Sequence, residues 1–338
     1  MFSVKNKKQI LITTTTVCIL LLLIFSPQIT AEGAKEGLAI CMQVIIPSLF
    51  PFFFITSYLN SMLLCMDIPV MKALGKCLHI PANCEGLLLL GLIGGYPVGA
   101  QAICEAWHNK KLHRQQAHIL MGYCSNAGPA FIFGVTASLF NNPFTPWALW
   151  LIHILSAILT AFLLPKYHSD VKYMPDKSPI TLLQAFQNSL RITASVCGWI
   201  IIFKVILSHL FSMLPVPGAS FRTFLTAILE LSSGCIALNN ITSISNRFIL
   251  CSCFLAFGGM CVLLQTASAT ADVGLGLYIP GKLTQTIISY LLSVFLLLML
   301  HRNELRVSTI LVSFPVSFIS IWLLRNYCRK KLWKKSDL

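Results

Sequence analysis

Two polar, glycine-rich interruptions lie inside apolar segments of membrane-spanning length, and they constrain the fold more than any other feature. One interruption reads GLIGGYPVGAQ (residues 91–101) and the other reads GYCSNAGPA (residues 122–130). The hydrocarbon core of a bilayer offers no water to loose backbone N–H and C=O groups, so irregular backbone persists there only where protein buries it or where it lines a wet cavity. Segments broken in this way indicate the binding site of a membrane transporter.

The composition places the chain in a lipid bilayer. Of its 338 residues, 56% are hydrophobic and 11% are charged, whereas a soluble domain carries about 25% charged residues. Several apolar runs approach the ~20 residues that span a bilayer. We therefore expect an all-α, polytopic protein of the cell membrane (the inner or plasma membrane).

The charge and the cysteines exclude two other classes of protein. The net charge is +14, but the basic residues form short clusters between apolar runs, without a basic domain. That pattern is typical of the positive-inside rule and argues against a nucleic-acid partner. The 13 cysteines lie mostly within apolar runs and form no Cys-x-x-Cys pair. They are typical of small buried hydrophobic residues, and no metal site is predicted.

Hydropathy predicts about eight transmembrane helices and two shorter, broken segments. The first helix is expected to be retained, because a signal peptidase site at this end would place Ile29 where a small residue is preferred. The predicted spans are at about 9–26, 38–64, 117–140, 146–165, 192–214, 248–271, 284–300 and 307–324, and the broken segments are at 84–106 and 221–240.

Charge predicts that each broken segment is a re-entrant hairpin. Basic clusters around Lys72 and Lys110 flank the first segment on both sides, so both of its ends are expected in the cytoplasm. The second segment lies between Arg222 and Arg247, whose sparse charge suits the outside. With both termini cytoplasmic, most of the 25 lysines and arginines, Lys282 included, fall on the cytoplasmic side.

This topology predicts an inverted repeat within a single integral membrane domain, residues 1–338. Each half runs span, hairpin, span, span, over residues 38–165 and again over 191–300. The halves begin on opposite sides of the membrane, as in inverted-repeat transporters. Residues 166–190 form a cytoplasmic linker, whose second part is expected to be an amphipathic helix at the interface. Residues 301–338 hold the last helix and a basic cytoplasmic tail.

Candidate substrate-binding residues lie at the breaks, where proline removes a backbone donor and glycine permits non-helical backbone. Tight packing of a hairpin tip, or a proline kink among small residues, is the alternative in each case. The predicted residues are Gly95, Tyr96, Pro97, Gly99, Gln101, Ser125, Asn126 and Gly128 in the first half, and Glu230, Ser233, Gly259, Gln265 and Thr266 in the second.

Two ionisable residues fall within the predicted membrane region. An intramembrane carboxylate indicates a functional site, and Glu230 is the best candidate, unless it faces outside water at the hairpin mouth. Lys204 lies inside the predicted span 192–214, too far from either end to reach the interface easily. We predict that Lys204 and Glu230 form a gating charge pair, with a purely structural ion pair as the alternative.

The sequence gives no sign of an enzyme, and no cofactor is expected. The segment Gly276–Lys282 spells the first part of a P-loop, but Leu283 replaces the serine or threonine that would meet magnesium. This segment also precedes a membrane span and does not follow a strand. The histidines show no zinc-ligand spacing, and no nucleophile–base pair is visible.

Three motifs in the first half resemble a known family. IIPSLFPFFFITSYL (45–59), GLIGGYPVGAQ (91–101) and GYCSNAGPAFIFGV (122–135) resemble the sporulation integral membrane protein YlbJ family. More widely they resemble the nucleoside-recognition (Gate) domains of concentrative nucleoside transporters and ferrous-iron permeases. The resemblance implies a Gate-type fold whose hairpins and broken helices meet at the midplane. Carried over by position, the Gly95–Gln101 turn, Asn126, Glu230 and the Gly258–Ser268 break face the solute.

The chain also departs from those transporters. Its first hairpin carries Tyr96–Pro97 where nucleoside transporters carry a Glu-Ala-Pro-like tip, so the resemblance does not make a nucleoside the substrate. No GTPase module is present in the sequence, so the chain is not a complete iron permease.

Together these observations predict a secondary transporter or permease of a small polar solute, acting in endospore formation. Na⁺ or H⁺ is the expected coupling ion. Whether the chain assembles with further copies of itself into a homo-oligomer is left open. The alternative is a membrane scaffold that does not transport and that is needed for spore-envelope (cortex) assembly.

Overall fold

The computed structural model describes residues 4–63, 69–81, 84–110, 112–167, 180–214, 218–300, 324, 326 and 327. Within these ranges every regular element is a helix, which confirms the expected all-α class. The predicted last span, 307–324, and the basic tail fall almost wholly outside the described residues, as do residues 168–179 of the linker.

Five described helical segments are long and apolar enough to cross a membrane, so the chain is a multi-pass membrane protein. The predicted span 117–140 is not among them, because its helix is interrupted at residues 121–128. The five segments are Pro27–Leu59, Thr145–Leu163, Leu182–Met213, Ile244–Ala269 and Tyr278–Leu300.

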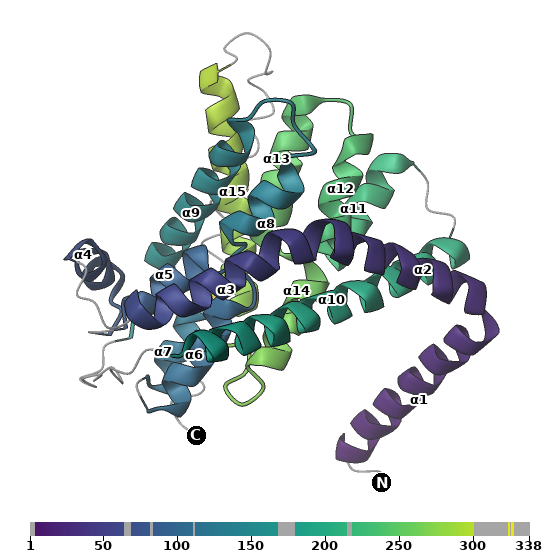
Figure 1. The fold of residues 1–338 in the computed structure, drawn as a ribbon, viewed down its shortest axis with the longest axis horizontal. Helices are drawn as coiled ribbons and strands as arrows, with labels where there is room; N and C mark the ends of the chain where they lie inside the picture. Colours follow the sequence, from purple (N-terminus) through teal and green to yellow (C-terminus); the bar gives the residue numbers. More distant parts are fainter. Residues whose placement is uncertain are drawn as a thin grey trace.

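One layer of the structure consists of two long helices that lie side by side (Figure 1). α2 (Pro27–Ile40) continues through a π-helical stretch, η1 (Cys41–Ile45), into α3 (Ile46–Leu63). α10 (Leu182–Met213) packs along both α2 and α3. α1 (Val4–Phe25) extends away from this layer.

Two predicted boundaries in this layer are wrong. The second span does not begin at residue 38, because helix geometry already starts at Pro27. The linker does not end at residue 190, because its second part, expected as an amphipathic helix at the interface, is continuous with α10 from Leu182. Thr181 caps that helix: its Oγ1 accepts a hydrogen bond from Gln184 N (3.2 Å), and its own N–H donates to Gln184 Oε1 (2.8 Å). This reciprocal capping box fixes the start of the long helix.

Two glycines allow α2 to approach α10 closely. A Cβ atom on Gly33 would lie 2.8 Å from the Cα atom of Val205, and one on Gly37 would lie 2.8 Å from the Cα atom of Ile201. Glycines four residues apart form the small-xxx-small pattern that lets membrane helices pack backbone to backbone.

Three further long helices form a second group (Figure 1). α15 (Tyr278–Leu300) packs against both α9 (Thr145–Leu163) and α13 (Ile244–Phe257). Ser252 Oγ of α13 and Ser289 Oγ of α15 share a buried hydrogen bond of 2.6 Å. Interhelical hydroxyl pairs of this kind join helices that have no hydrophobic effect between them in lipid.

Short helices, together with α13 of the second group, form two hairpins and two broken helices, as the interruptions in the sequence predicted. α4 (Pro69–Leu78) precedes the first hairpin, and η2 (Leu238–Asn240) follows the second. The hairpins are α5 (Gly86–Ile93) with α6 (Val98–His108), and α11 (Ala219–Leu229) with α12 (Leu231–Ala237); the broken helices are α7 (Arg114–Leu120) with α8 (Pro129–Thr136), and α13 with α14 (Gly259–Ala269).

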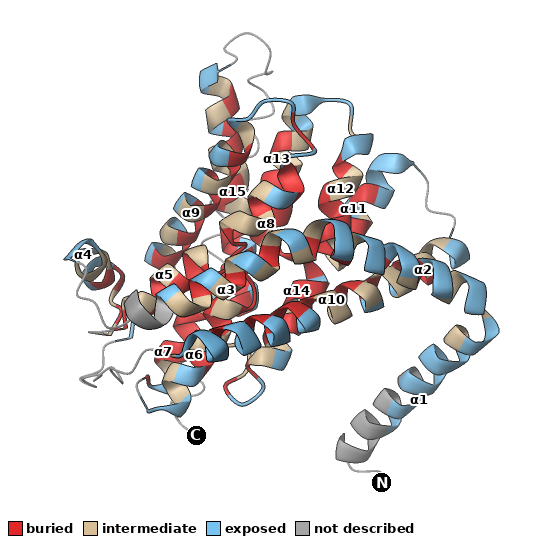
Figure 2. Ribbon diagram, viewed as in Figure 1, coloured by how far each residue is buried: buried red, intermediate tan, exposed pale blue. Residues whose placement is uncertain are grey.

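The order of elements therefore occurs twice: a long helix, a hairpin, a broken helix and a long helix. Hairpin helices and broken helices are more buried than the long helices of the first layer. Buried residues are frequent on α5, α7, α8, α13 and α14, whereas much of α2 and α3 is exposed (Figure 2). Exposed apolar side chains such as Met42, Ile55 and Ile202 belong to the outer layer. An apolar surface of this kind suits contact with lipid chains.

The glycine contact between α2 and α10 gives a matched pair of variants. We expect Gly37→Leu to destabilise the protein by about 1–3 kcal/mol, because the new side chain pushes against the Ile201 backbone. Gly198→Leu, on α10, is the control, since a Cβ there meets nothing within 4 Å. Thermal unfolding in detergent measures both, and equal melting temperatures would contradict the close approach of the two helices.

Candidate functional site

The tip of the first hairpin touches the break in the first broken helix. Gly95, at the tip, has a φ of +78°, which favours glycine. A Cβ on Gly95 would lie 3.2 Å from the backbone N of Gly128, and one on Gly128 would lie 2.9 Å from the carbonyl O of Ile93. The two glycines therefore permit contact between backbones that larger residues would separate.

The second hairpin meets the second broken helix in the same way. Gly258 and Gly259 separate α13 from α14 with φ values of +82° and +78°. A Cβ on Gly259 would lie 3.0 Å from Ala227 O and 3.5 Å from Leu231 N, both in the second hairpin. The hydroxyl of Tyr96 lies 3.2 Å from the Cβ position of Gly258, so the first hairpin also reaches this break. All four interruptions thus meet in one region.

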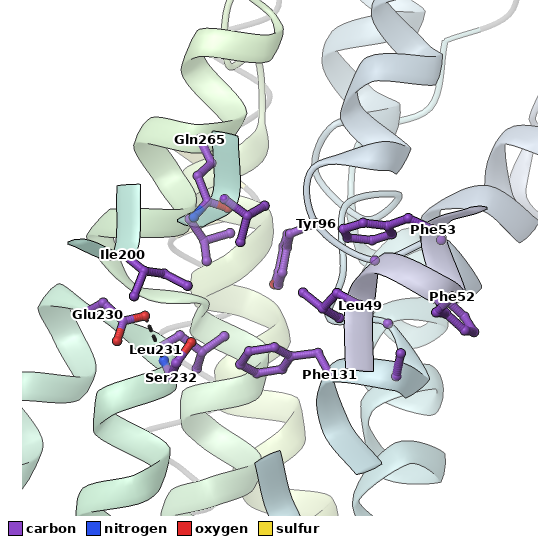
Figure 3. Close-up of a pocket in the computed structure, with 16 residues that line it drawn as sticks. Leu49, Phe52, Phe53, Tyr96, Phe131, Ile200, Glu230, Leu231, Ser232 and Gln265 are labelled. Carbon is purple, nitrogen blue, oxygen red and sulfur yellow. Dashed lines mark hydrogen bonds between the residues drawn. The ribbon is translucent and has the colours of Figure 1, made fainter. Parts of the chain in front are cut away.

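A cavity of about 30 Å³ lies in this region (Figure 3). That volume holds about two water molecules. Its walls are largely apolar, and polar side chains reach it from three of the four interruptions. The labelled lining residues are Leu49, Phe52, Phe53, Tyr96, Phe131, Ile200, Glu230, Leu231, Ser232 and Gln265.

Glu230 is the charged residue of the cavity. It separates α11 from α12 and is 1% exposed, so the alternative that it faces outside water is wrong. One carboxylate oxygen accepts a hydrogen bond from Ser232 N (2.8 Å) and the other accepts one from Ser233 N (2.6 Å; Figure 3 shows the first). These bonds satisfy two N–H groups at the start of α12, and each oxygen keeps further acceptor capacity for a ligand.

The predicted pair of Lys204 and Glu230 is wrong. Lys204 Nζ lies 2.7 Å from Glu36 Oε2 on α2. The prediction placed residue 36 before the span, where it could not have met Lys204. A second cavity, of about 450 Å³, lies between α2, α10 and the second hairpin. Lys204, Glu36 and Ser233 all line it.

Asn126 supports the site without lining the first cavity. Its Nδ2 donates to Gly91 O (3.0 Å) and to Tyr123 O (2.7 Å), which joins the break to the first hairpin. Its Oδ1 accepts a hydrogen bond from Lys282 Nζ at 3.1 Å. Lys282 is 1% exposed, so its prediction as a cytoplasmic loop charge is wrong. Its span begins at Tyr278 and not at residue 284, and this places the lysine inside the bundle.

The predicted residues therefore divide into three groups. Five of them line the small cavity, namely Gly95, Tyr96, Gly128, Glu230 and Gln265. Ser233 lines the larger cavity. Those that line neither cavity are Pro97, Gly99, Gln101, Ser125, Asn126, Gly259 and Thr266.

Some members of the last group have clear packing roles. Gly99 packs directly against the carbonyl of Cys124, where no Cβ would fit. The apolar walls, including Phe53, Phe131 and Ile200, were not predicted from the sequence, because nothing in an apolar run marks which side chain faces a cavity.

Comparison with known proteins gives one relative. The sporulation integral membrane protein YlbJ of Bacillus subtilis (strain 168) is 28% identical over 123 residues, which cover 36% of this chain and 30% of the relative. The chain is similar to YlbJ over this segment. The predicted resemblance to YlbJ is thereby confirmed, although the match spans under a third of the relative's length. No family model matches the chain, and no solved structure matches it.

The contact between Gly128 and the first hairpin can be tested by one methyl group. We expect Gly128→Ala to lower the melting temperature and to speed backbone amide exchange at residues 93–98, because the methyl group meets backbone atoms of Ile93 and Gly95. The control is Gly274→Ala, where φ is +80° but a Cβ would meet nothing within 4 Å. Its backbone strain should destabilise only the surrounding loop and leave amide exchange at residues 93–98 unchanged. Unchanged exchange at 93–98 in Gly128→Ala would contradict the contact.

Proposed function

We propose that the chain is a secondary transporter of a small polar solute, with alternating access around its two hairpins. The observation that carries this proposal is that two hairpin tips and two helix breaks meet in one region, and that both tips and the first break line a cavity there. Non-helical backbone at membrane depth belongs where it lines a cavity, and in transporters such breaks bind substrate. The repeated order of elements supports an inverted repeat with re-entrant hairpins, and the distribution of basic residues favours cytoplasmic termini.

The lining of the small cavity suits a solute with hydrogen-bond donors. Small-molecule sites combine apolar walls with a few placed polar groups. Here the Glu230 carboxylate and the Gln265 amide face walls that include Phe53 and Phe131. The Tyr96 hydroxyl is buried and has no hydrogen-bond partner among the described residues. A ligand that donates to Glu230 and contacts Tyr96 would satisfy both groups.

The second hairpin is the proposed gate. The small cavity holds about 30 Å³, whereas sites for drug-sized molecules are about 300–1,000 Å³, so a solute enters only if the hairpins separate. Ser232 lines this cavity while the next residue, Ser233, lines the larger one. Residues 230–233 thus form a wall between the two cavities, and movement of this short segment would join them.

The biological process in which the proposed activity takes place is inferred from the similar protein of Bacillus subtilis. The printed name of the Bacillus subtilis protein describes a sporulation integral membrane protein. We propose that this chain likewise acts during endospore formation. Its solute is not implied by that name.

Thermal-shift screening of the purified protein against nucleosides, amino acids, dicarboxylates and metal ions tests the transport proposal. A solute at 100-fold its dissociation constant should stabilise the folded state by about 2.7 kcal/mol. We expect Glu230→Gln to weaken binding of that solute about tenfold or more, because the amide has a similar shape but loses the charge and one of the two acceptor oxygens. Glu105→Gln, at an exposed position on the first hairpin, should bind like the wild type.

Two outcomes would contradict transport. One is a well-folded sample that no solute stabilises, and the other is equal affinity in Glu230→Gln and the wild type. Either result would favour the scaffold role in spore-envelope assembly, which needs no solute site.

A further inference from the structure

Lys282 is the one buried lysine or arginine in the part of the chain that the structure describes. Its ammonium donates to Gln285 Oε1 at 2.7 Å and to Asn126 Oδ1 at 3.1 Å. The centroids of the Tyr96 and Tyr278 rings lie 5.1 and 5.8 Å from Nζ. No carboxylate of the described residues forms an ion pair with it. The partners of this cation are therefore neutral oxygens and aromatic faces.

The orientation of the two amides is fixed by their other hydrogen bonds. The Nδ2 group of Asn126 is used by the carbonyls of Gly91 and Tyr123, so its oxygen must face Lys282. The Nε2 group of Gln285 points to the carbonyl of His153 at 3.4 Å, which turns the Gln285 oxygen toward the same point. Two amide oxygens that converge in a buried position form a cation site, since hard cations prefer carbonyl and carboxylate oxygens.

The titratable groups that face the ammonium do not neutralise it. They are Tyr96 of the first hairpin, Cys124 of the first break, His153 of α9 and Tyr278 of α15 itself. None of these side chain types carries a negative charge at neutral pH in its ordinary state. The two amide oxygens and the two rings are thus the groups that would stabilise a positive charge on Lys282.

We propose that the ammonium of Lys282 is a tethered cation, which fills the site of Asn126 and Gln285 in place of a free Na⁺. Tyr96 connects this site to transport, because its ring contacts the ammonium while the same residue lines the small cavity. The inference deepens the proposed transport function and rests on it for its role. It implies that solute binding does not require sodium.

The first test exchanges sodium for choline and uses no solute. We expect the wild-type melting temperature to be the same in sodium chloride and choline chloride of equal strength. Lys282→Ala removes the ammonium and keeps both oxygens, so it should gain a saturable stabilisation by Na⁺. In Lys282→Ala combined with Gln285→Leu that gain should be lost. Saturable stabilisation of the wild type by Na⁺, or a folded Lys282→Ala without sodium dependence, would overturn the proposal.

A second pair of variants keeps the proposal testable if Lys282→Ala does not fold. Gln285→Glu places a carboxylate where the amide oxygen now lies 2.7 Å from Nζ. Against a charged ammonium the carboxylate forms a buried ion pair, so Gln285→Glu should melt well above Gln285→Leu, which removes the partner. Equal melting temperatures would mean that no cation is held there. Because neither readout involves a solute, failure of the transport proposal would leave both results interpretable.

Discussion

The structure depends on how the backbone is satisfied where helices stop inside the apolar bundle. Each interruption leaves N–H and C=O groups that lipid cannot pair, and at the first broken helix and the second hairpin polar side chains supply the missing partners. Asn126 donates to two carbonyls, Glu230 accepts from two N–H groups, and His153 Nε2 accepts from the N–H of Ala127 at 3.1 Å. These polar residues are required by the fold before any solute is considered.

The same side chains then acquire a second role from their position. Glu230 caps α12 and also faces the small cavity, so a movement of the second hairpin tip changes the site directly. Asn126 joins the first hairpin to α15 through Lys282, and the Lys282 ammonium lies beside Tyr96 of that hairpin. A change of charge at Lys282 would therefore alter its contact with the Tyr96 ring, and so affect the tip of the first hairpin. Fold and candidate site share one network of contacts.

The sequence predicts the interruptions well because glycine and proline act locally. Gly95, Gly128 and Gly258 mark breaks whose positions the structure confirms. It predicts charge partners poorly, because the rule that basic residues mark the cytoplasmic side treats Lys282 as a loop residue, whereas tertiary packing buries it. Glu36 is missed as the partner of Lys204, since its charge lowers the hydropathy of a segment that is nevertheless helical. Long-range contacts of this kind leave no local signal.

Thiol accessibility at the gate tests the central claim most directly. Ser232 and Ser252 are each 2% exposed, but only Ser232 lines the small cavity. In a background without the native cysteines, membrane vesicles of both orientations would be treated with a membrane-impermeant thiol reagent. The account predicts that Ser232→Cys reacts and that Ser252→Cys, within the α13–α15 contact, does not. Equal lack of reaction at both positions, from both sides, would contradict a gate that opens this cavity to water.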